Sequence, residues 1–310
     1  MTRIFTPTQL SLFATSKLAA WWEELNIKKK IPNFPEPSEL EKRLMKQGDM
    51  LEKNLLETFK KEGKSFVDIG DISTNKNEKY AKTIKFMQEG KDIIYQAALQ
   101  NKSIIGNADF LYKISEPSNL GNWSYEPIEC KLSSKTKTTF LIQSCCYCDL
   151  LENILGKKPN RFHLYLGGGK KLSDNIFKFS DFEYWYIQLK MQYKQFIDDF
   201  DPEKEPDILP GNHGKWDTFI ENELRDRKDL SLVAGMTQFQ RNRLHKQKIF
   251  TIDDFAKSDL SKTFKNEEDP LKILKKQAEV QVHSKNDNGK PYYEWRNIEE
   301  NEKIKSLPFP

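Results

Sequence analysis

The sequence contains few cysteines and no long apolar run. Four cysteines occur among 310 residues, which fits a protein from a reducing compartment better than one stabilised by disulfides. No stretch resembles a signal peptide or is apolar for long enough to cross a bilayer, so we expect no membrane partner. With a mean hydropathy of −0.75 and 31% charged residues, the sequence predicts a soluble, cytoplasmic protein.

The chain is long enough for a domain of about 200 residues and a smaller one. Hydrophobic residues make up 37% of the sequence, which is enough for a packed core. Prolines and acidic residues gather between Asp201 and Gly214, and we place the domain boundary there. The expected domains are residues 1–200 and residues 201–310, of which the second is a small helical module.

The net charge of +4 is too small to indicate a nucleic-acid partner by itself, but its distribution is uneven. From Lys131 to Lys171 the sequence has eight basic residues and only two acidic ones. A local excess of this kind is typical of a phosphate-binding surface. Ordinary solvated loop lysines are the alternative interpretation.

Two predicted strands bring acidic side chains and a lysine together. Residues 104–114 alternate, and we expect one apolar side formed by Ile104, Ala108, Phe110, Tyr112 and Ile114. Asp109 lies on the other side, because side chains two apart in a strand point the same way. Residues 125–132 alternate likewise and place Glu129 and Lys131 on one face. If the two strands pair, two carboxylates converge beside an amine.

This combination suits metal-dependent phosphate chemistry. Carboxylate oxygens are the ligands that Mg²⁺ prefers, and a bound cation acidifies water and neutralises charge on a phosphoryl group. A neighbouring lysine can orient the attacking water and offset phosphate charge. For Glu129 and Lys131 taken alone, a salt bridge on a solvated strand face is the alternative, because Glu-x-Lys is common by chance.

The order of these residues resembles a known enzyme family, the RecB-like branch of the PD-(D/E)xK nuclease superfamily. The matching motifs are Gly48-x-x-x-Glu52, Gly106-Asn107-Ala108-Asp109, Glu129-Cys130-Lys131 and Gln143-x-x-x-Tyr147. A weaker match comprises Thr83, Met87, Gly90, Ile94 and Gln96. The resemblance implies an α/β, restriction-endonuclease-like core, with a mixed sheet flanked by helices, followed by a small C-terminal helical module.

The resemblance also implies a role for each matching residue. Glu52, Asp109 and Glu129 would hold Mg or Mn, Lys131 would be the catalytic lysine, and a last sequence motif would lie near the substrate. That motif comprises Gln143 and Tyr147. Many relatives have histidine where this chain has the helical glutamate. From the residues alone, a helix-surface ion pair for the glutamate and a half-buried core tyrosine stay open as alternatives.

Some relatives bind an iron–sulfur cluster through one cysteine well before the active site and three after it. Here no cysteine precedes Cys130, and the adjacent Cys145 and Cys146 would diverge by about 100° on a helix. We therefore expect no iron–sulfur cluster and interpret all four cysteines, Cys148 included, as small core residues. Relatives often continue into a ribonuclease-H-like domain, so such a domain or a helicase is an expected partner.

Several local patterns predict secondary structure. A capping box at residues 6–9 begins one helix that extends past Trp22, and a second box at residues 38–41 begins another that reaches about Glu62. Gly48 lies inside the second helix, so we expect a helix break or a close backbone approach there. Residues 83–90 are expected to lead into the sheet.

The C-terminal module contains a pattern similar to a helix-hairpin-helix element. A glycine turn at Gly235 would place backbone amides, together with Arg241, against a DNA phosphate. A helical spacer that packs on the nuclease domain is an equally good interpretation of residues 232–255.

These patterns together predict a Mg- or Mn-dependent nuclease that hydrolyses DNA phosphodiester bonds in repair, recombination or defence. The basic excess lies on one side of the strand that carries Glu129 and Lys131. A groove with one basic wall suits a single strand or an unpaired end better than a closed duplex. A non-catalytic nucleic-acid-binding module on the same fold and an RNA-directed nuclease are the alternatives.

Overall fold

The computed structural model describes residues 3–28, 31, 36–72, 75–169, 171–208, 211–259 and 270–286. The chain divides into two compact units: unit 1 comprises residues 1–206 and 211–217, and unit 2 comprises residues 207–210 and 218–310. The predicted boundary after residue 200 therefore differs from the observed division, because the stretch 211–217 packs with unit 1.

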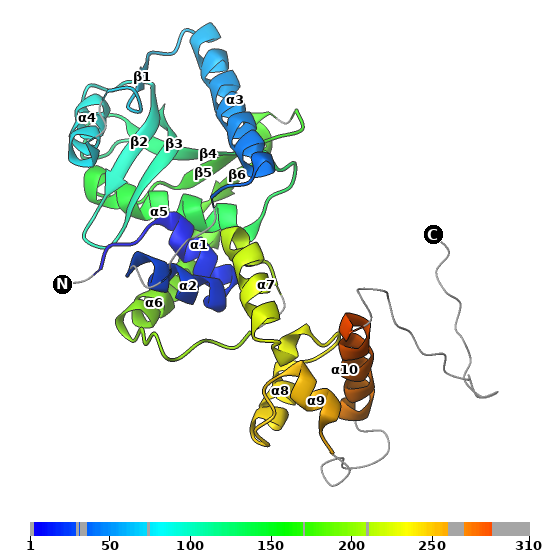
Figure 1. Cartoon of the computed structure of the whole chain (residues 1–310). Helices are drawn as coiled ribbons and strands as arrows, with labels where there is room; N and C mark the ends of the chain where they lie inside the picture. Colours follow the sequence, from blue (N-terminus) through cyan, green and yellow to red (C-terminus); the bar gives the residue numbers. More distant parts are fainter. Residues whose placement is uncertain are drawn as a thin grey trace. The chain divides into compact units, whose positions relative to one another are not determined.

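Unit 1 is built on a six-stranded mixed sheet with the strand order β1-β2-β3-β4-β5-β6. The strands are β1 (Phe66–Asp68), β2 (Ile93–Gln100), β3 (Ile105–Ile114), β4 (Ser124–Lys131), β5 (Arg161–Leu166) and β6 (Ile176–Lys178). β1 pairs with β2 and β4 pairs with β5 in parallel, whereas the other neighbours are antiparallel. The class is α/β, with helices on both faces of the sheet (Figure 1).

The helices of unit 1 are α1 (Pro7–Thr15), α2 (Lys17–Ile27), α3 (Glu39–Lys61), α4 (Lys76–Gln88), α5 (Thr138–Leu155) and α6 (Glu183–Asp198). The larger core lies between the sheet and α5, and side chains of α1 and α6 complete it. A smaller core lies under α3 on the other face (Figure 1). There Leu55, Leu56 and Phe59 cover side chains of β2, β3, β4 and β5. The sheet is thus covered on both faces.

The side chains of β2 and β3 do not alternate throughout. Ala108 packs in the α5-side core, whereas Phe110 packs under α3, so the expectation that both share one side is wrong. Gln96 of β2 and Asp109 of β3 lie between two pairs of the register, Tyr95 with Phe110 and Ala97 with Ala108. The backbone of Gln96 has a φ of +54°. A residue in this left-handed conformation interrupts the pleat. The pleat is therefore interrupted at two polar residues, Gln96 of β2 and Asp109 of β3.

Three local predictions differ from the structure. The first helix breaks at Ser16, whose hydroxyl accepts a hydrogen bond from the backbone of Ala19 and so caps α2. α3 runs without interruption through Gly48, and nothing lies within 4 Å of a Cβ added there. Residues 83–88 belong to helix α4 rather than to an extended lead into the sheet. The two predicted capping boxes, by contrast, are confirmed at Thr6 and Ser38.

Unit 2 contains α7 (Asp217–Asp226), α8 (Gln238–His245), α9 (Ile252–Lys257) and α10 (Pro270–Asn286). Its apolar cluster is formed by residues of α8, α9, α10 and the stretch 230–236. Gly235 has a φ of +81° and forms the turn before α8. Arg241 is 3% exposed and bonds to Asp229 and to the carbonyl of Ile208. The prediction that Arg241 contacts phosphate is therefore wrong, because its guanidinium is already used within the unit.

None of the helices in the described part of the chain is long and apolar enough to cross a membrane.

Candidate active site

Asp109 and Glu129 lie where the pairing of β3 with β4 ends. The last paired residues are Phe110 and Ile128, and Asp109 and Glu129 are the next residues on the two strands. Beyond this point a side chain replaces the backbone ladder: Oδ2 of Asp109 accepts a hydrogen bond from the Cys130 amide at 2.7 Å. The divergence of the two strands makes room for both carboxylates.

Glu129 and Lys131 form an ion pair on the same strand, with 2.5 Å between Nζ and Oε1. Glu129 is 3% exposed, and its second oxygen, Oε2, is buried without a hydrogen-bond partner among the described residues. The ammonium group of Lys131 also lies 5.8 Å from the ring centroid of Phe140 on α5. A buried carboxylate with one unsatisfied oxygen costs free energy, so this site has capacity for a further donor or a cation.

Glu52 reaches the site from α3. Its Oε2 accepts hydrogen bonds from the Tyr95 hydroxyl at 2.9 Å and from Nε2 of Gln96 at 2.7 Å. The left-handed turn at Gln96 aims that amide at the helix. Tyr95 was not among the predicted site residues, whereas its neighbour Gln96 belongs to the weaker of the sequence matches. Together they fix the position of Glu52.

The carboxyl groups of the site raise one another's pKa. Burial raises the pKa of Asp109 well above its usual value, and the charges of Glu129 and Glu52 add to this effect. Burial likewise raises the pKa of Glu129 and of Glu52, although the ammonium group of Lys131 opposes both shifts. For Lys131, burial lowers the pKa, but the charges of Glu129 and Asp109 outweigh it and leave the pKa raised. Lys131 is thus an ammonium ion at neutral pH.

The donor atoms of the site are of the kind that a divalent cation binds. Asp109 and Glu129 offer oxygen ligands, their negative charges repel one another, and one oxygen is unsatisfied. In the part of the chain that the structure describes, no three His, Cys, Asp or Glu residues are grouped closely enough to hold a metal ion as they stand. The third predicted ligand, Glu52, is held by hydrogen bonds from Tyr95 and Gln96.

The two residues of the predicted α5 motif lie in different environments. The hydroxyl group of Tyr147 donates to the carbonyl of Asn107 at 2.7 Å, and the side chain is 6% exposed. Tyr147 therefore anchors β3 two residues before Asp109 instead of offering its hydroxyl to a substrate. Gln143 is only partly buried, and its Oε1 is enclosed without a hydrogen-bond partner in the described residues. Of the two, Gln143 alone has a polar atom available for a ligand.

Other residues shape the end of β4. Gly167 donates its amide to the carbonyl of Lys131 at 2.8 Å, and a Cβ at this position would lie 2.2 Å from the carbonyl oxygen of Leu132. Glycine is thus required for β5 to approach β4 beside the lysine. On the other side of the sheet's centre, the hydroxyl of Thr83 accepts from the Ala98 amide at 3.1 Å and ties α4 to β2.

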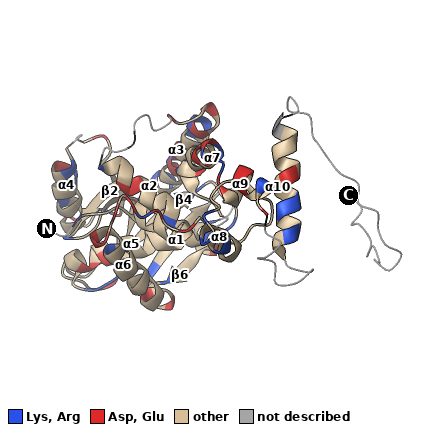
Figure 2. Ribbon diagram, turned by 60° about the horizontal axis from the view of Figure 1, so that its bottom comes forward, with Lys and Arg blue, Asp and Glu red and all other residues tan. Residues whose placement is uncertain are grey.

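The basic residues counted in the sequence do not form one surface. Lys157 pairs with Glu116, and Lys158 pairs with Glu183, both near the C-terminal end of α5. Lys137 precedes the N-terminal end of this 18-residue helix, about 27 Å away. Along α3 and α4, acidic and basic residues lie side by side (Figure 2). The lysines at the C-terminal end of α5 are therefore paired with acids, whereas Lys131 and Lys137 lie toward its N-terminal end.

All four cysteines are free and buried. Cys130 packs under α3, whereas Cys145, Cys146 and Cys148 belong to the α5-side core.

No protein-family model matches the chain, and no curated protein matches its sequence.

Proposed function

We propose that unit 1 is a metal-dependent nuclease of the RecB-like PD-(D/E)xK type, and that it hydrolyses phosphodiester bonds in DNA. One observation carries the proposal: Asp109 and Glu129 from neighbouring strands converge beside Lys131, and Oε2 of Glu129 is buried and unsatisfied in the described structure. The mixed sheet with helices on both faces is compatible with that fold. We place this activity in the cytoplasm.

Each residue has a role that follows from its contacts. Asp109 and Glu129 hold the divalent cation, with Glu52 held nearby by Tyr95 and Gln96. When bound, Mg²⁺ or Mn²⁺ supplies charge neutralisation and a more acidic water. Lys131 donates hydrogen bonds and positive charge to the phosphate, because its amine is a protonated ion-pair partner of Glu129.

Single-stranded DNA or an unpaired end is the substrate form that the charge distribution favours. The cationic side chains near the carboxylates are Lys131 and Lys137, and the lysines at the other end of α5 are taken up in ion pairs. A duplex presents phosphates along two backbones, whereas one short basic wall serves a single backbone.

The test compares labelled single-stranded DNA, blunt duplex DNA, closed circular duplex DNA and single-stranded RNA, each with Mg²⁺ and with Mn²⁺. Wild-type protein is expected to cut the single strand fastest. Glu129→Gln and Lys131→Ala should each lose activity by at least about a hundredfold, as loss of one charge-stabilising group typically does. Glu126→Gln is the matched control, because this buried acid is on the same strand and bonds to His163 outside the site.

The outcomes separate the competing functions. Cutting of RNA alone would assign an RNA-directed nuclease. Binding without cutting of any substrate, with either metal, would assign a non-catalytic binding module. Rapid cutting of the closed circle with the single strand spared would contradict the proposed substrate form. Metal binding is checked separately: Mg²⁺ or Mn²⁺ should raise the Tm of the wild type and of Glu126→Gln, but not that of Glu129→Gln.

A further inference from the structure

A cavity of about 910 Å³ lies beside the candidate active site, within unit 1. Its walls are α1, the first turns of α5 and the stretch 212–215. Most of its lining is apolar, with hydroxyl, amide and amine groups interspersed, and the residues that matter here are Thr8, Ala14, Lys137, Phe140, Gln143 and Lys215. A volume of this size is within the range of small-molecule sites, which is about 300–1,000 Å³.

The walls of the cavity are joined by hydrogen bonds, some of them made by residues that line it. The Ser11 hydroxyl donates to the carbonyl of Thr139 at 3.2 Å and so joins α1 to α5. The third wall is anchored on α2 and the residue before it. Nδ1 of His213 is 2.7 Å from the Ser16 hydroxyl, and Nε1 of Trp216 donates to Glu23 at 3.0 Å. The cavity is therefore a preformed part of the fold.

The cavity is connected to the active site through two residues of α5. Phe140 lines the cavity, and its ring centroid lies 5.8 Å from the amine of Lys131 and 5.9 Å from that of Lys137. Gln143 lines it as well, one turn farther along the helix. A nucleic-acid strand with one phosphate beside Lys131 can place its next nucleotide in the cavity.

The chemistry of the lining fits a nucleotide. Oε1 of Gln143 is enclosed and lacks a donor among the described residues, so it suits a base amino group or a sugar hydroxyl, not a phosphate. At the beginning of α5, Lys137 makes no side-chain capping bond in the described structure, and the first turn has no acid. Backbone amides and a lysine at this helix end attract a phosphate.

We propose that this cavity binds the unpaired nucleotide next to the phosphate that is cut, with its base toward Gln143 and its outer phosphate at the beginning of α5. The inference rests on the proposed nuclease function and adds a reason for single-strand preference. A base can enter the cavity only when it is not paired, since pairing places the partner strand against the same edge.

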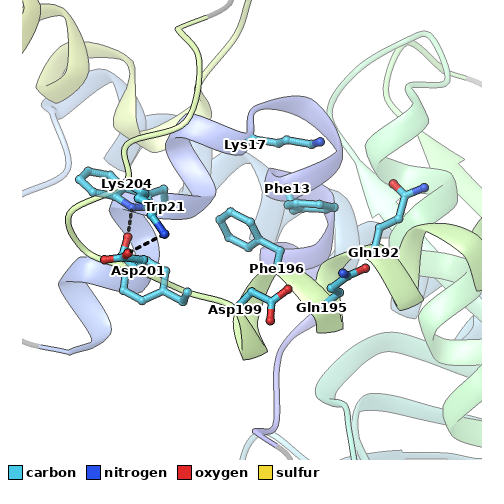
Figure 3. Close-up of a pocket in the computed structure, with 10 residues that line it drawn as sticks. Phe13, Lys17, Trp21, Gln192, Gln195, Phe196, Asp199, Asp201 and Lys204 are labelled. Atoms are coloured by element: carbon cyan, nitrogen blue, oxygen red, sulfur yellow. Dashed lines mark hydrogen bonds and ion pairs between the residues drawn. The ribbon is translucent and has the colours of Figure 1, made fainter.

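A smaller cavity of about 390 Å³ between α1, α2 and the end of α6 differs in kind (Figure 3). The carboxylate of Asp201 there pairs with Lys204, and its carbonyl accepts from Nε1 of Trp21 (Figure 3). The rings of Phe13 and Phe196 pack on one another at 5.1 Å. The nucleotide is assigned to the larger cavity because that cavity adjoins Lys131 through Phe140.

The first test measures binding without cutting, with fluorescein-labelled hexathymidylate in EDTA. Ala14→Trp places an indole in the cavity from an exposed position and should weaken binding by about tenfold, as loss of one stacked base does. Ala81→Trp is the matched control, because Ala81 is also exposed on a helix but lies on α4. Equal binding by the two variants would overturn the proposal.

The second test uses a substitution whose effects on stability and binding have opposite signs. Lys137→Asp should raise the Tm, because aspartate caps a helix and lysine does not, and should weaken binding of the oligonucleotide. Lys76→Asp in the first turn of α4 provides the same charge change away from the cavity and should leave binding unchanged. Unchanged binding by Lys137→Asp would remove the outer phosphate from this helix end and contradict the proposal.

Cleavage assays separate this inference from the proposed function. Bis(p-nitrophenyl) phosphate has no neighbouring nucleotide, so Ala14→Trp should hydrolyse it at the wild-type rate while cutting single-stranded DNA more slowly. Equal loss on both substrates would contradict the cavity's role. If the wild type hydrolyses neither substrate, the nuclease proposal fails, and the EDTA binding comparison still decides whether the cavity takes a nucleotide.

Discussion

Strand β4 carries two buried carboxylates three residues apart, and their surroundings differ. Glu126 is 4% exposed and bonds to Nε2 of His163 at 2.6 Å. Glu129 is 3% exposed, lies beside Asp109 and has an oxygen without a partner in the described structure. Equal burial thus has different consequences: the first acid stabilises the sheet, and the second is held in a state that a bound cation would relieve.

The same contrast occurs along α5. Asp149 accepts hydrogen bonds from the Tyr186 hydroxyl and from Lys190, both at 2.8 Å, and so joins α5 to α6. Gln143, nearer the beginning of the helix, has an enclosed oxygen that lacks such a partner among the described residues. Asp149 is thus structural, whereas Glu129 and Gln143 each have an enclosed oxygen without a partner in the described structure.

The largest expected effect is that of Asp109→Asn. Activity should fall by at least about a hundredfold, since a ligand of the cation is lost. The metal-free protein should nevertheless unfold at a higher temperature. The pKa of Asp109 is raised in the folded state, so its ionisation at neutral pH opposes folding, and asparagine can still accept from the Cys130 amide. Activity assays and thermal unfolding in EDTA measure the two effects. A lower Tm would show that this carboxylate is structural, like that of Glu126.

The next effect is on stability alone. Glu126→Leu leaves His163 buried without its partner and should cost about 1–3 kcal/mol in the free energy of unfolding, measured in urea. Glu126→Gln keeps a hydrogen-bond acceptor and should cost less. Both variants should retain the metal-induced rise in Tm. Loss of that rise in Glu126→Gln would end the distinction between the two acids.

Tyr147→Phe tests whether the α5 tyrosine positions β3 or binds substrate. Removal of the hydroxyl leaves the Asn107 carbonyl without its donor and should cost about 1 kcal/mol in the free energy of unfolding. Because Asp109 is two residues away, kcat should fall while KM stays near the wild-type value. A rise in KM with unchanged stability would instead place the hydroxyl against the substrate.

The smallest effect concerns pH and a pair outside the site. Burial raises the pKa of Asp92, but hydrogen bonds from Lys113 and Ser65 outweigh it and lower the pKa to about 2. A depressed pKa means that the stabilisation is present above the unfolded pKa of about 3.9 and is lost as the pH falls toward 2. Wild-type protein should therefore lose more stability than Asp92→Asn between pH 5 and pH 2. Urea titrations at each pH measure the difference, and parallel curves would contradict it.

The elements that local chemistry dictates could be predicted from the sequence. Capping boxes at Thr6 and Ser38 begin helices where expected, because a hydroxyl and a side chain three residues later satisfy the first amides in any context. The α/β class agrees with what the resemblance of the motifs implied. The break at Ser16 could also have been predicted, since serine is a preferred cap. The sequence could not decide whether α3 continues through Gly48. One glycine costs a helix only about 1 kcal/mol, which the other residues of the helix can offset.

The sequence by itself determined which residue types are present for chemistry: two acids and a lysine at strand spacing, and a glutamine and a tyrosine at helical spacing. Only the tertiary structure decided which of them have unsatisfied atoms. Tyr147 is bonded to a carbonyl 40 residues away, and Lys158 forms an ion pair with Glu183. The physical reason is that burial and pairing depend on contacts between distant segments. Gln96 of β2, for example, has a left-handed backbone and donates a hydrogen bond to Glu52, which is 44 residues away on α3.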